Sequence, residues 1–254
     1  MAKGFQCIMK ITSVNNDTIK FATKLQQRKF RDESGLFLLE GEKCIEEAIS
    51  SGIEIENIFV SEDNCNVFHN EKIIEATEPV LAKVSTTSTP PKAVAVAKQP
   101  KYKWSDKFKK VILLEDIKDA GNLGTILRSA CAFDVDAIIL YGDTVDLFNP
   151  KCVRSSVGNL WKIPVFSVSD FDWIKSKFQD FEKIATLPKN EQSIWLKDYI
   201  PKDKVLIMFG TESSGLSSNL KDFANQNITI EMSKKVESLN LSTSASIIMY
   251  KIFL

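Results

Sequence analysis

Histidine is nearly absent from this chain of 254 residues, which contains His69 alone. Ser-His-Asp catalysis, Cys-His catalysis and histidine–metal chemistry each need a positioned imidazole. A single histidine in the polar stretch NVFHNEK argues against all three kinds of site. We interpret His69 as a surface residue.

The cysteines form no recognisable set. There are five of them, widely spread and without a CxxC pair: Cys7, Cys44, Cys65, Cys131 and Cys152. An odd, scattered set argues against a disulfide framework, and no cysteine lies at ligand spacing from the histidine. We therefore expect no bound metal.

Long apolar runs and net charge are also missing. No stretch approaches about 18 consecutive apolar residues, so we expect no membrane-spanning helix. The first ten residues, MAKGFQCIMK, lack the apolar core and cleavage site of a signal peptide, which favours a cytoplasmic protein. The 33 basic and 33 acidic residues balance, which argues against a uniformly basic nucleic-acid coat protein.

The neutral sum hides an uneven distribution of charge. Residues 1–31 carry seven basic side chains against one acid, residues 32–62 carry nine acids against one lysine, and residues 98–110 carry six lysines against one acid. Each run alone is typical of a solvated helix face. Two basic runs in a neutral chain nevertheless suggest contacts with phosphate groups.

The first hundred residues alternate between helical and strand patterns. Helices are predicted from Asn15 or Asn16 to Arg31, over EKCIEEAISSG and over HNEKIIEAT, and strands at GLFLLEG, IENIFVSE, VLAKVS and KAVAVAK. The basic, proline-containing stretch KQPKYKWSDKFKK has no clear period. We place a boundary there and predict domains at residues 1–104 and 105–254.

The second part opens on KKVILLED, a nearly continuous apolar run typical of a parallel strand buried on both faces. Further strands are predicted at AIILYG, IPVFSVS, KIATL, KVLIMFG and NITIEM. Helices are predicted within DAGNLGTILRSACAF, FDWIKSKF and SLNLSTSASIIMYKIF. This alternation predicts an α/β domain with a parallel sheet.

Three polar loops follow predicted strands at their carboxyl ends, where open α/β sheets bind ligands. In the first, glycines permit a tight turn and Asn122 can cap the helix that follows. Asn122 and Arg128 are six residues apart, about 240° around a helix. If both serve one site, Asn122 is expected to lie in the loop.

The second loop, FGTESSGL, places glycine at both ends and Glu212 at the mouth of a strand, with Ser213 or Ser214 as a candidate helix cap. In the third, Ser238 can cap a helix whose first turns contain Asn240 and Ser242, which are poor helix formers. That local cost is more readily understood if the polar groups meet a ligand. Taken singly, each loop is also explained as a capped helix start, and none carries a GxGxxG or Walker pattern.

In this order, however, the three loops resemble the signature motifs NxGxxxR, GxExxGL and SLNxS of the SpoU (TrmH) family of SPOUT methyltransferases. The stretch NPKCVRSSVGNLWKIPV is similar to the family's segment between the first and second motifs. The similarity covers roughly residues 111–254. The preceding NNDTIKFATKLQQRKFRDESGLFLLEGEKCIEEAI resembles the L30e-like RNA-binding domain often found before it.

The resemblance implies a ribose 2′-O-methyltransferase that uses S-adenosylmethionine on structured RNA. Large-subunit ribosomal RNA is the first expectation for the substrate and transfer RNA the second. A homodimer is also implied, together with a trefoil-knotted α/β domain, threaded by the chain from about residue 205, behind a smaller L30e-like α/β domain.

Residue by residue, the resemblance places catalytic groups at Asn122, Arg128, Glu212, Ser238 and Asn240. It places the cofactor against Gly210, Glu212, Leu216, Ile230, Met232 and Leu239. Together with the basic runs, it suggests RNA contacts at Arg28, Lys29, Arg31 and Arg154.

Arg128 is the family's proposed activator of the ribose hydroxyl. Because an arginine with a pKa above about 12 is a poor base, we interpret Arg128 as a phosphate anchor that stabilises the developing alkoxide, with the proton passing to phosphate or water. Two positions depart from the family pattern. Ala120 and Glu231 stand where prolines are usual.

Two other classes of function remain as alternatives. A non-catalytic RNA-binding protein, such as a ribosome assembly factor, would keep the fold and lose turnover, but the retained polar residues of the three motifs speak against it. A dehydrogenase or other nucleotide enzyme on a parallel sheet would need a glycine fingerprint that this chain lacks.

Overall fold

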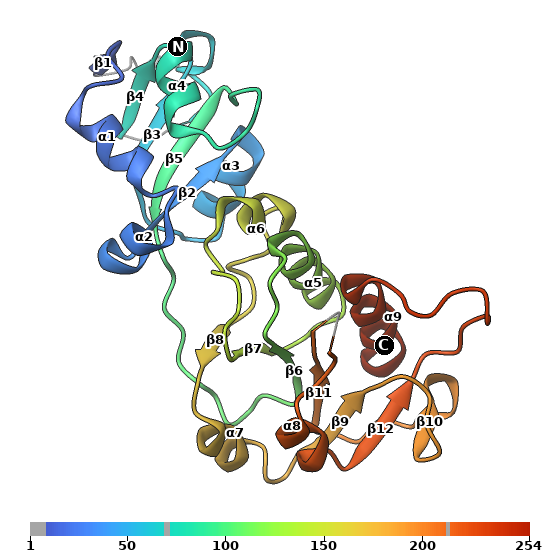
Figure 1. The fold of residues 1–254 in the computed structure, drawn as a ribbon. Coiled ribbons are helices and arrows are strands. Elements are labelled where there is room, and N and C mark those ends of the chain that lie inside the picture. Colours follow the sequence, from blue (N-terminus) through green and yellow to red (C-terminus); the bar gives the residue numbers. More distant parts are fainter. Residues whose placement is uncertain (1–8, 69–71, 212–213) are drawn as a thin grey trace. The chain divides into compact units, whose positions relative to one another are not determined.

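The computed structural model describes residues 9–68, 72–211 and 214–254, and its helices and strands fall into two compact units (Figure 1). The first unit runs to Lys101 and also includes Asp146–Trp161. The second unit consists of Tyr102–Val145 and Lys162–Leu254. His69, interpreted above as a surface residue, lies outside the described residues.

The described strands of the first unit form one mixed sheet in the order β1-β4-β3-β5-β2. Strands β2 and β3 run antiparallel to β5, whereas β1 and β3 run parallel to β4. Their bounds are β1 (Met9–Ile11), β2 (Leu36–Glu40), β3 (Ile55–Val60), β4 (Ile73–Ala76) and β5 (Ala93–Lys98).

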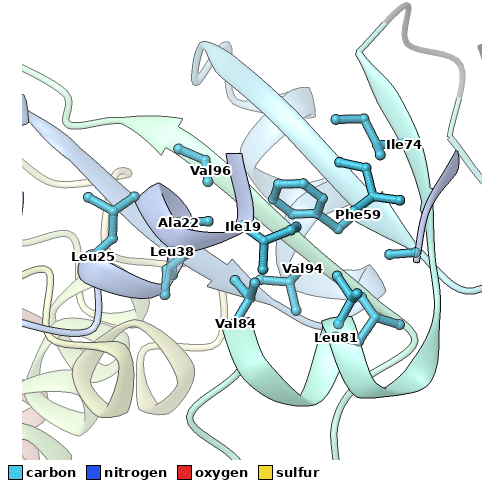
Figure 2. Close-up of a cluster of buried hydrophobic side chains, with 13 residues drawn as sticks. Ile19, Ala22, Leu25, Leu38, Phe59, Ile74, Leu81, Val84, Val94 and Val96 are labelled. Carbon is cyan, nitrogen blue, oxygen red and sulfur yellow. The ribbon is translucent and has the colours of Figure 1, made fainter. Parts of the chain in front are cut away.

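Three helices of this unit, at residues 17–24, 42–50 and 78–84, bury apolar side chains along one face. In α1, Asn16 caps the first turn by accepting from Thr18 N, and Ile19 and Ala22 are buried. Figure 2 shows these side chains packed with Phe59 of β3 and Val94 of β5. The helices described in this unit are α1 (Asp17–Lys24), α2 (Arg28–Ser34), α3 (Glu42–Ser50), α4 (Glu78–Val84) and α6 (Pro150–Ser155), with a 3₁₀ turn η1 (Glu62–Asn64).

Three predictions for the first unit are wrong in detail. The helix expected to reach Arg31 ends at Lys24, and α2 begins separately at Arg28. The segment IIEA, expected in a helix, is strand β4 because it pairs with β1 and β3, which a short apolar run does not reveal. VLAKVS, expected as a strand, belongs to α4, where a proline in the first turn favours the helix.

The second unit contains a parallel sheet, as predicted. Its described strands lie in the order β10-β12-β9-β11-β6-β7-β8, and every adjacent pair is parallel. The bounds are β6 (Lys110–Glu115), β7 (Ala137–Tyr141), β8 (Val165–Val168), β9 (Glu182–Thr186), β10 (Ser193–Trp195), β11 (Val205–Phe209) and β12 (Gln226–Thr229). All five residues of β11 are buried, which explains its continuous apolar run.

Helices cover this sheet, and α5 packs against α9. The helices described in this unit are α5 (Ala120–Ala132), α7 (Phe171–Lys177), α8 (Ser218–Phe223) and α9 (Leu241–Phe253), with a 3₁₀ turn η2 (Leu196–Asp198). The short strand β10 is an addition to the predicted pattern, whereas α8 follows the second motif loop, where a capped helix start was one of the interpretations. The threading of a knot stays a prediction.

Every helix in the described ranges is too short or too polar to cross a membrane. The same residues contain no group of three histidine, cysteine or acidic side chains placed to bind a metal ion.

Candidate active site

The carboxyl ends of β9, β11 and β12 surround a cleft of about 900 Å³ in the second unit. Ligand pockets commonly fall between about 300 and 1,000 Å³, so the cleft has the size of a cofactor site. Its lining includes Gly210 after β11, Ile230 and Met232 after β12, and Leu239 and Asn240 at the start of α9. The second and third motif loops therefore meet at one edge of the sheet.

Two backbone hydrogen bonds join Thr211 and Gly215 in the second motif loop. Thr211 N donates to Gly215 O at 3.1 Å and Gly215 N donates to Thr211 O at 3.0 Å. A Cβ added at Gly210 would lie 2.1 Å from the carbonyl carbon of Gly215, so only glycine permits this close approach. Glu212, a predicted catalytic and cofactor-binding residue, lies outside the described residues.

Two predictions for this loop change with the structure. Leu216, expected at the cofactor, is buried in the apolar core beside Leu220 and is absent from the described lining of the cleft. The cap of the helix that follows is Ser217, which accepts from Leu220 N, rather than Ser213 or Ser214.

The third motif begins α9 through Asn240. Its Oδ1 accepts from Ser242 N at 2.9 Å and from Thr243 N at 3.3 Å, so Asn240 is the helix cap. The prediction that Ser238 caps this helix is therefore wrong. Asparagine is among the best N-cap residues, and the supposed cost of placing it inside the helix does not arise. Ser238 lies in the preceding loop and lines the cleft.

The first motif joins the third through a side-chain hydrogen bond. Asn240 Nδ2 donates to Asn122 Oδ1 at 3.1 Å. Asn122 lies in the first turn of α5, where its backbone N–H donates to the capping carboxylate of Asp119 at 2.8 Å. Asn122 is thus neither a cap nor a loop residue, contrary to the prediction, and it still reaches the site.

Arg128 lies further along α5, on its exposed face with Thr125 and Ala132. It is absent from the described lining of the cleft and forms no ion pair with any described residue. The structure therefore joins Asn122 to Asn240, places Ser238 and Asn240 in the cleft lining, and leaves Arg128 on the exposed face of α5.

Helices α5 and α9 remain in contact beyond the two asparagines. The hydroxyl oxygens of Ser129 and Ser246 are 2.7 Å apart, and the rings of Phe133 and Tyr250 lie 5.9 Å apart between centroids. Polar and aromatic contacts thus hold the first-motif helix α5 against the third-motif helix α9 at several positions along their length.

The two departures from the family pattern have local explanations. Ala120 is the first residue of α5, a position where helices accept proline and alanine alike because the first N–H groups have no partner within a helix. Glu231 lies 3.7 Å from the ammonium of Lys197, so an exposed ion pair stands where a proline ring is usual.

The first unit changes the interpretation of two predicted RNA-binding residues. Arg31 is 2 % exposed, and its Nε and Nη2 lie 2.6 and 2.5 Å from Asp146 Oδ2. Arg154 binds the buried carboxylate of Glu40 and the hydroxyl of Thr86. The guanidinium of Arg31 is enclosed by protein, so the prediction that Arg31 contacts RNA is wrong.

Arg28 and Lys29 are exposed on α2, where they lie 3.5 Å from Asp32 and 3.9 Å from Glu33. The second basic run is partly neutralised as well. Lys98 pairs with Glu54, Lys109 pairs with Asp203, and Lys110 donates to the carbonyl of Phe253. Three lysines of that run remain exposed without an ion pair to a described residue, namely Lys101, Lys103 and Lys107.

Part of the cleft wall has no counterpart in the predicted site. Thr186 and Leu187, at the end of β9, line the cleft together with Lys189 and Trp195. The segment carries no motif, and the only signal is that KIATL ends as a buried strand beside β11.

Residues 109–250 match the SpoU rRNA Methylase family, and residues 16–95 match the MRM3-like substrate binding domain. The chain is 30% identical to an uncharacterised tRNA/rRNA methyltransferase of Synechocystis, over 96% of this chain and 93% of the relative. It is 29% identical to the 23S rRNA (guanosine(2553)-2′-O)-methyltransferase RlmP of Bacillus subtilis, over 95% and 98% of the two chains. The chain belongs to the SpoU rRNA methylase family, which confirms the resemblance of the three motifs.

Solved structures agree over nearly the whole chain. The crystal structure of an RNA 2′-O ribose methyltransferase shares 31% identity, with a TM-score of 0.80 over 96% of this chain and 97% of the other. An AdoMet-bound rRNA methyltransferase from Sinorhizobium meliloti shares 26% identity, with a TM-score of 0.83 over 95% and 96%. The predicted α/β fold with a preceding smaller domain is confirmed.

Proposed function

We propose that this protein is an S-adenosylmethionine-dependent 2′-O-methyltransferase of large-subunit ribosomal RNA. The observation that carries the proposal is the hydrogen bond between Asn240 and Asn122, which joins the first and third motifs beside a cofactor-sized cleft. Relatives named for 23S rRNA ribose methylation support the substrate class.

The cleft suits the cofactor in size and in surface. Leu187, Ile230, Leu239 and Ile248 offer apolar surface, and Gly210, Thr211 and Gly215 of the second motif loop line the cleft with them. We assign Gly210, Ile230, Met232 and Leu239 to cofactor binding. When bound, S-adenosylmethionine supplies an electrophilic methyl group.

The protein's own groups orient the ribose and stabilise charge. Positioning an oxygen for in-line attack and excluding water supply much of the rate in such a transfer. Asn122, Ser238 and Asn240 present amide and hydroxyl groups at the cleft edge, and the exposed guanidinium of Arg128 is suited to an RNA phosphate and to a developing alkoxide. No histidine of the second unit is available for the proton, so phosphate or water accepts it.

We further assign RNA binding to residues 1–104 and catalysis to residues 105–254, with the segment Asp146–Trp161 of the latter packing into the first unit. Arg28 and Lys29 are exposed and remain the proposed RNA contacts of the first. We also propose a cytoplasmic homodimer in which α9 faces its copy. On this helix and just past its end, Ile247, Tyr250 and Leu254 form an exposed apolar patch bordered by Thr243 and Lys251, with Tyr250 62% and Leu254 73% exposed.

Transfer of labelled methyl groups from S-adenosylmethionine tests the proposal. Unmodified 23S rRNA transcript is expected to gain one 2′-O-methyl group per molecule, whereas a tRNA transcript pool is expected to gain none. Methylation of tRNA alone would identify the alternative substrate. Tight rRNA binding without transfer would identify an assembly factor and overturn the enzymatic assignment.

A further inference from the structure

One wall of the cleft contains a cation–π pair formed by Lys189 and Trp195. The ammonium of Lys189 lies 4.7 Å from the ring centroid of Trp195, and it also donates to Ser193 O at 2.6 Å. Both side chains line the cleft that contains Gly210 and Leu239. Neither belongs to the three motifs.

The position of this ring is fixed by the sheet. Trp195 ends β10, which pairs with β12 so that Trp195 lies opposite Thr229. The hydroxyl of Thr229 donates to Leu187 O, which ties the end of β12 to the loop after β9. A half-buried indole held on a paired strand offers a preformed flat surface at little cost in side-chain entropy.

The same rim is positively charged. Among the described residues that line the cleft, the charged ones are Lys189, Lys221, Lys234 and Glu237, three lysines against one acid. Lys221 and Lys234 are exposed and form no ion pair with any described residue. A cleft lined by an aromatic ring and by lysines has the features of a site for single-stranded nucleic acid.

We propose that Trp195, Lys189, Lys221 and Lys234 hold the nucleotide that is to be methylated. The nucleobase stacks on the exposed part of the Trp195 ring, and the lysines neutralise the flanking phosphates. Since the ribose lies between base and phosphate, this contact brings its 2′-hydroxyl to the cleft. An unpaired nucleotide is required, because bases in an RNA helix are already stacked and paired. The inference rests on the proposed function and adds the site that receives the target.

Replacement of Trp195 separates RNA binding from cofactor binding. Trp195→Ala is expected to raise the KM for 23S rRNA transcript about tenfold or more, the usual effect of losing one base–aromatic stack. Trp195→Phe keeps a ring and is expected to stay within about threefold of the wild type. The Kd for S-adenosylmethionine, measured by calorimetry without RNA, is expected to be unchanged in both variants.

The lysines are tested by salt dependence. Lys221→Gln with Lys234→Gln is expected to weaken RNA binding and to reduce the slope of log K against log salt by about 1 to 2. Lys175→Gln with Lys202→Gln removes the same charge from exposed positions outside the described cleft lining and is expected to leave the slope unchanged.

Two results would overturn the inference. Weaker S-adenosylmethionine binding by Trp195→Ala, with RNA binding intact, would show that the ring serves the cofactor's adenine. Unchanged RNA binding and KM in both sets of variants would show that the wall is only structural. Failure of the wild type to transfer methyl groups at all would instead reject the proposed function, and the RNA affinities would still measure the role of this rim.

Discussion

Among single residues, Asn240 has the most demanding position. Its Oδ1 caps α9 through two backbone N–H groups, while its Nδ2 binds Asn122 on α5. One amide supplies both an acceptor and a donor, which serine and aspartate do not do in the same way. The residue that begins the third-motif helix is therefore also the residue that connects it to the first motif.

Replacement of Asn240 by alanine is expected to lower the free energy of unfolding by about 1 kcal/mol, because the cap of α9 is lost. Asn240→Asp keeps an oxygen at the cap and is expected to retain most of that stability, but it removes the Nδ2 donor. Urea unfolding followed by circular dichroism measures both effects. Equal stability of the alanine variant and the wild type would refute the capping role.

Arg128 is suited to charge stabilisation because it is exposed and forms no ion pair with a described residue. Arg128→Lys keeps the positive charge but loses the planar, multidentate guanidinium. We expect methyl transfer to fall at least 100-fold, while the Kd for S-adenosylmethionine stays within about twofold. Near-normal turnover by the lysine variant would remove Arg128 from the catalytic set.

The described cysteines offer a test of burial. Burial raises the pKa of the Cys131 thiol to about 11 and that of Cys44 to about 12. A raised pKa keeps the thiol protonated at pH 8, and only the thiolate reacts readily with iodoacetamide. Both cysteines are therefore expected to alkylate much more slowly at pH 8 in the native protein than in urea, with the native rate rising toward pH 11. Peptide mass spectrometry measures the rates, and equal native and unfolded rates would contradict the shifts.

Long helices and strands with a strong apolar pattern could be predicted from the sequence, whereas short ones depended on how they pair in the folded protein. The long apolar runs of β6 and β11 and the helix at α9 were predictable because their patterns are strong. The short β4 was predicted as a helix and the short α4 as a strand, because a few apolar residues fit either period. Pairing within the sheet decides between the two structures. Motif order identified the site, but Trp195 and Lys189 could not be predicted, since only the fold brings β10 to the cleft.

Helix α9 leads to a prediction about association. Ile247, Tyr250 and, just past the end of the helix, Leu254 form an exposed apolar patch beside Thr243 and Lys251, where most surface helices are polar throughout. Tyr250→Lys places a charge in this patch and is expected to shift the protein from dimer to monomer in light scattering after gel filtration. Ser176→Lys on α7 adds the same charge at another exposed position and is expected to have no effect. A wild-type monomer at micromolar concentration would reject this interface.

In the whole molecule, some of the basic residues form ion pairs with acidic residues of the same protein. Several basic residues that suggested RNA contacts are neutralised within the protein, with Arg31 bound to Asp146 and Arg154 bound to Glu40. Net charge therefore says little about the partner of this chain. The positions of the exposed, unpaired cations are more informative, and among the described residues they include Arg128, Lys221 and Lys234.

The same two ion pairs make the first unit depend on a segment that lies far along the chain. Asp146–Trp161 packs into this unit, where the ring of Phe148 lies 4.9 Å from that of Phe37 between centroids. A fragment of residues 1–104 lacks this segment. It would leave Arg31 and Glu40, each about 2% exposed at the side chain, without their partners of opposite charge.

Removing one partner from a buried ion pair commonly costs roughly 3–5 kcal/mol, which is a large part of the roughly 5–15 kcal/mol that stabilises a domain. The 1–104 fragment is therefore expected to be unfolded or rapidly cleaved by protease at 37 °C, although residues 16–95 contain the whole match to the substrate-binding domain. Adding a peptide of residues 146–161 is expected to raise its melting temperature, whereas a peptide with Asp146→Ala and Arg154→Ala is not. Cooperative unfolding of the fragment alone, at the temperature of the full-length protein, would show that the inserted segment contributes no stability and that residues 1–104 form a self-sufficient domain.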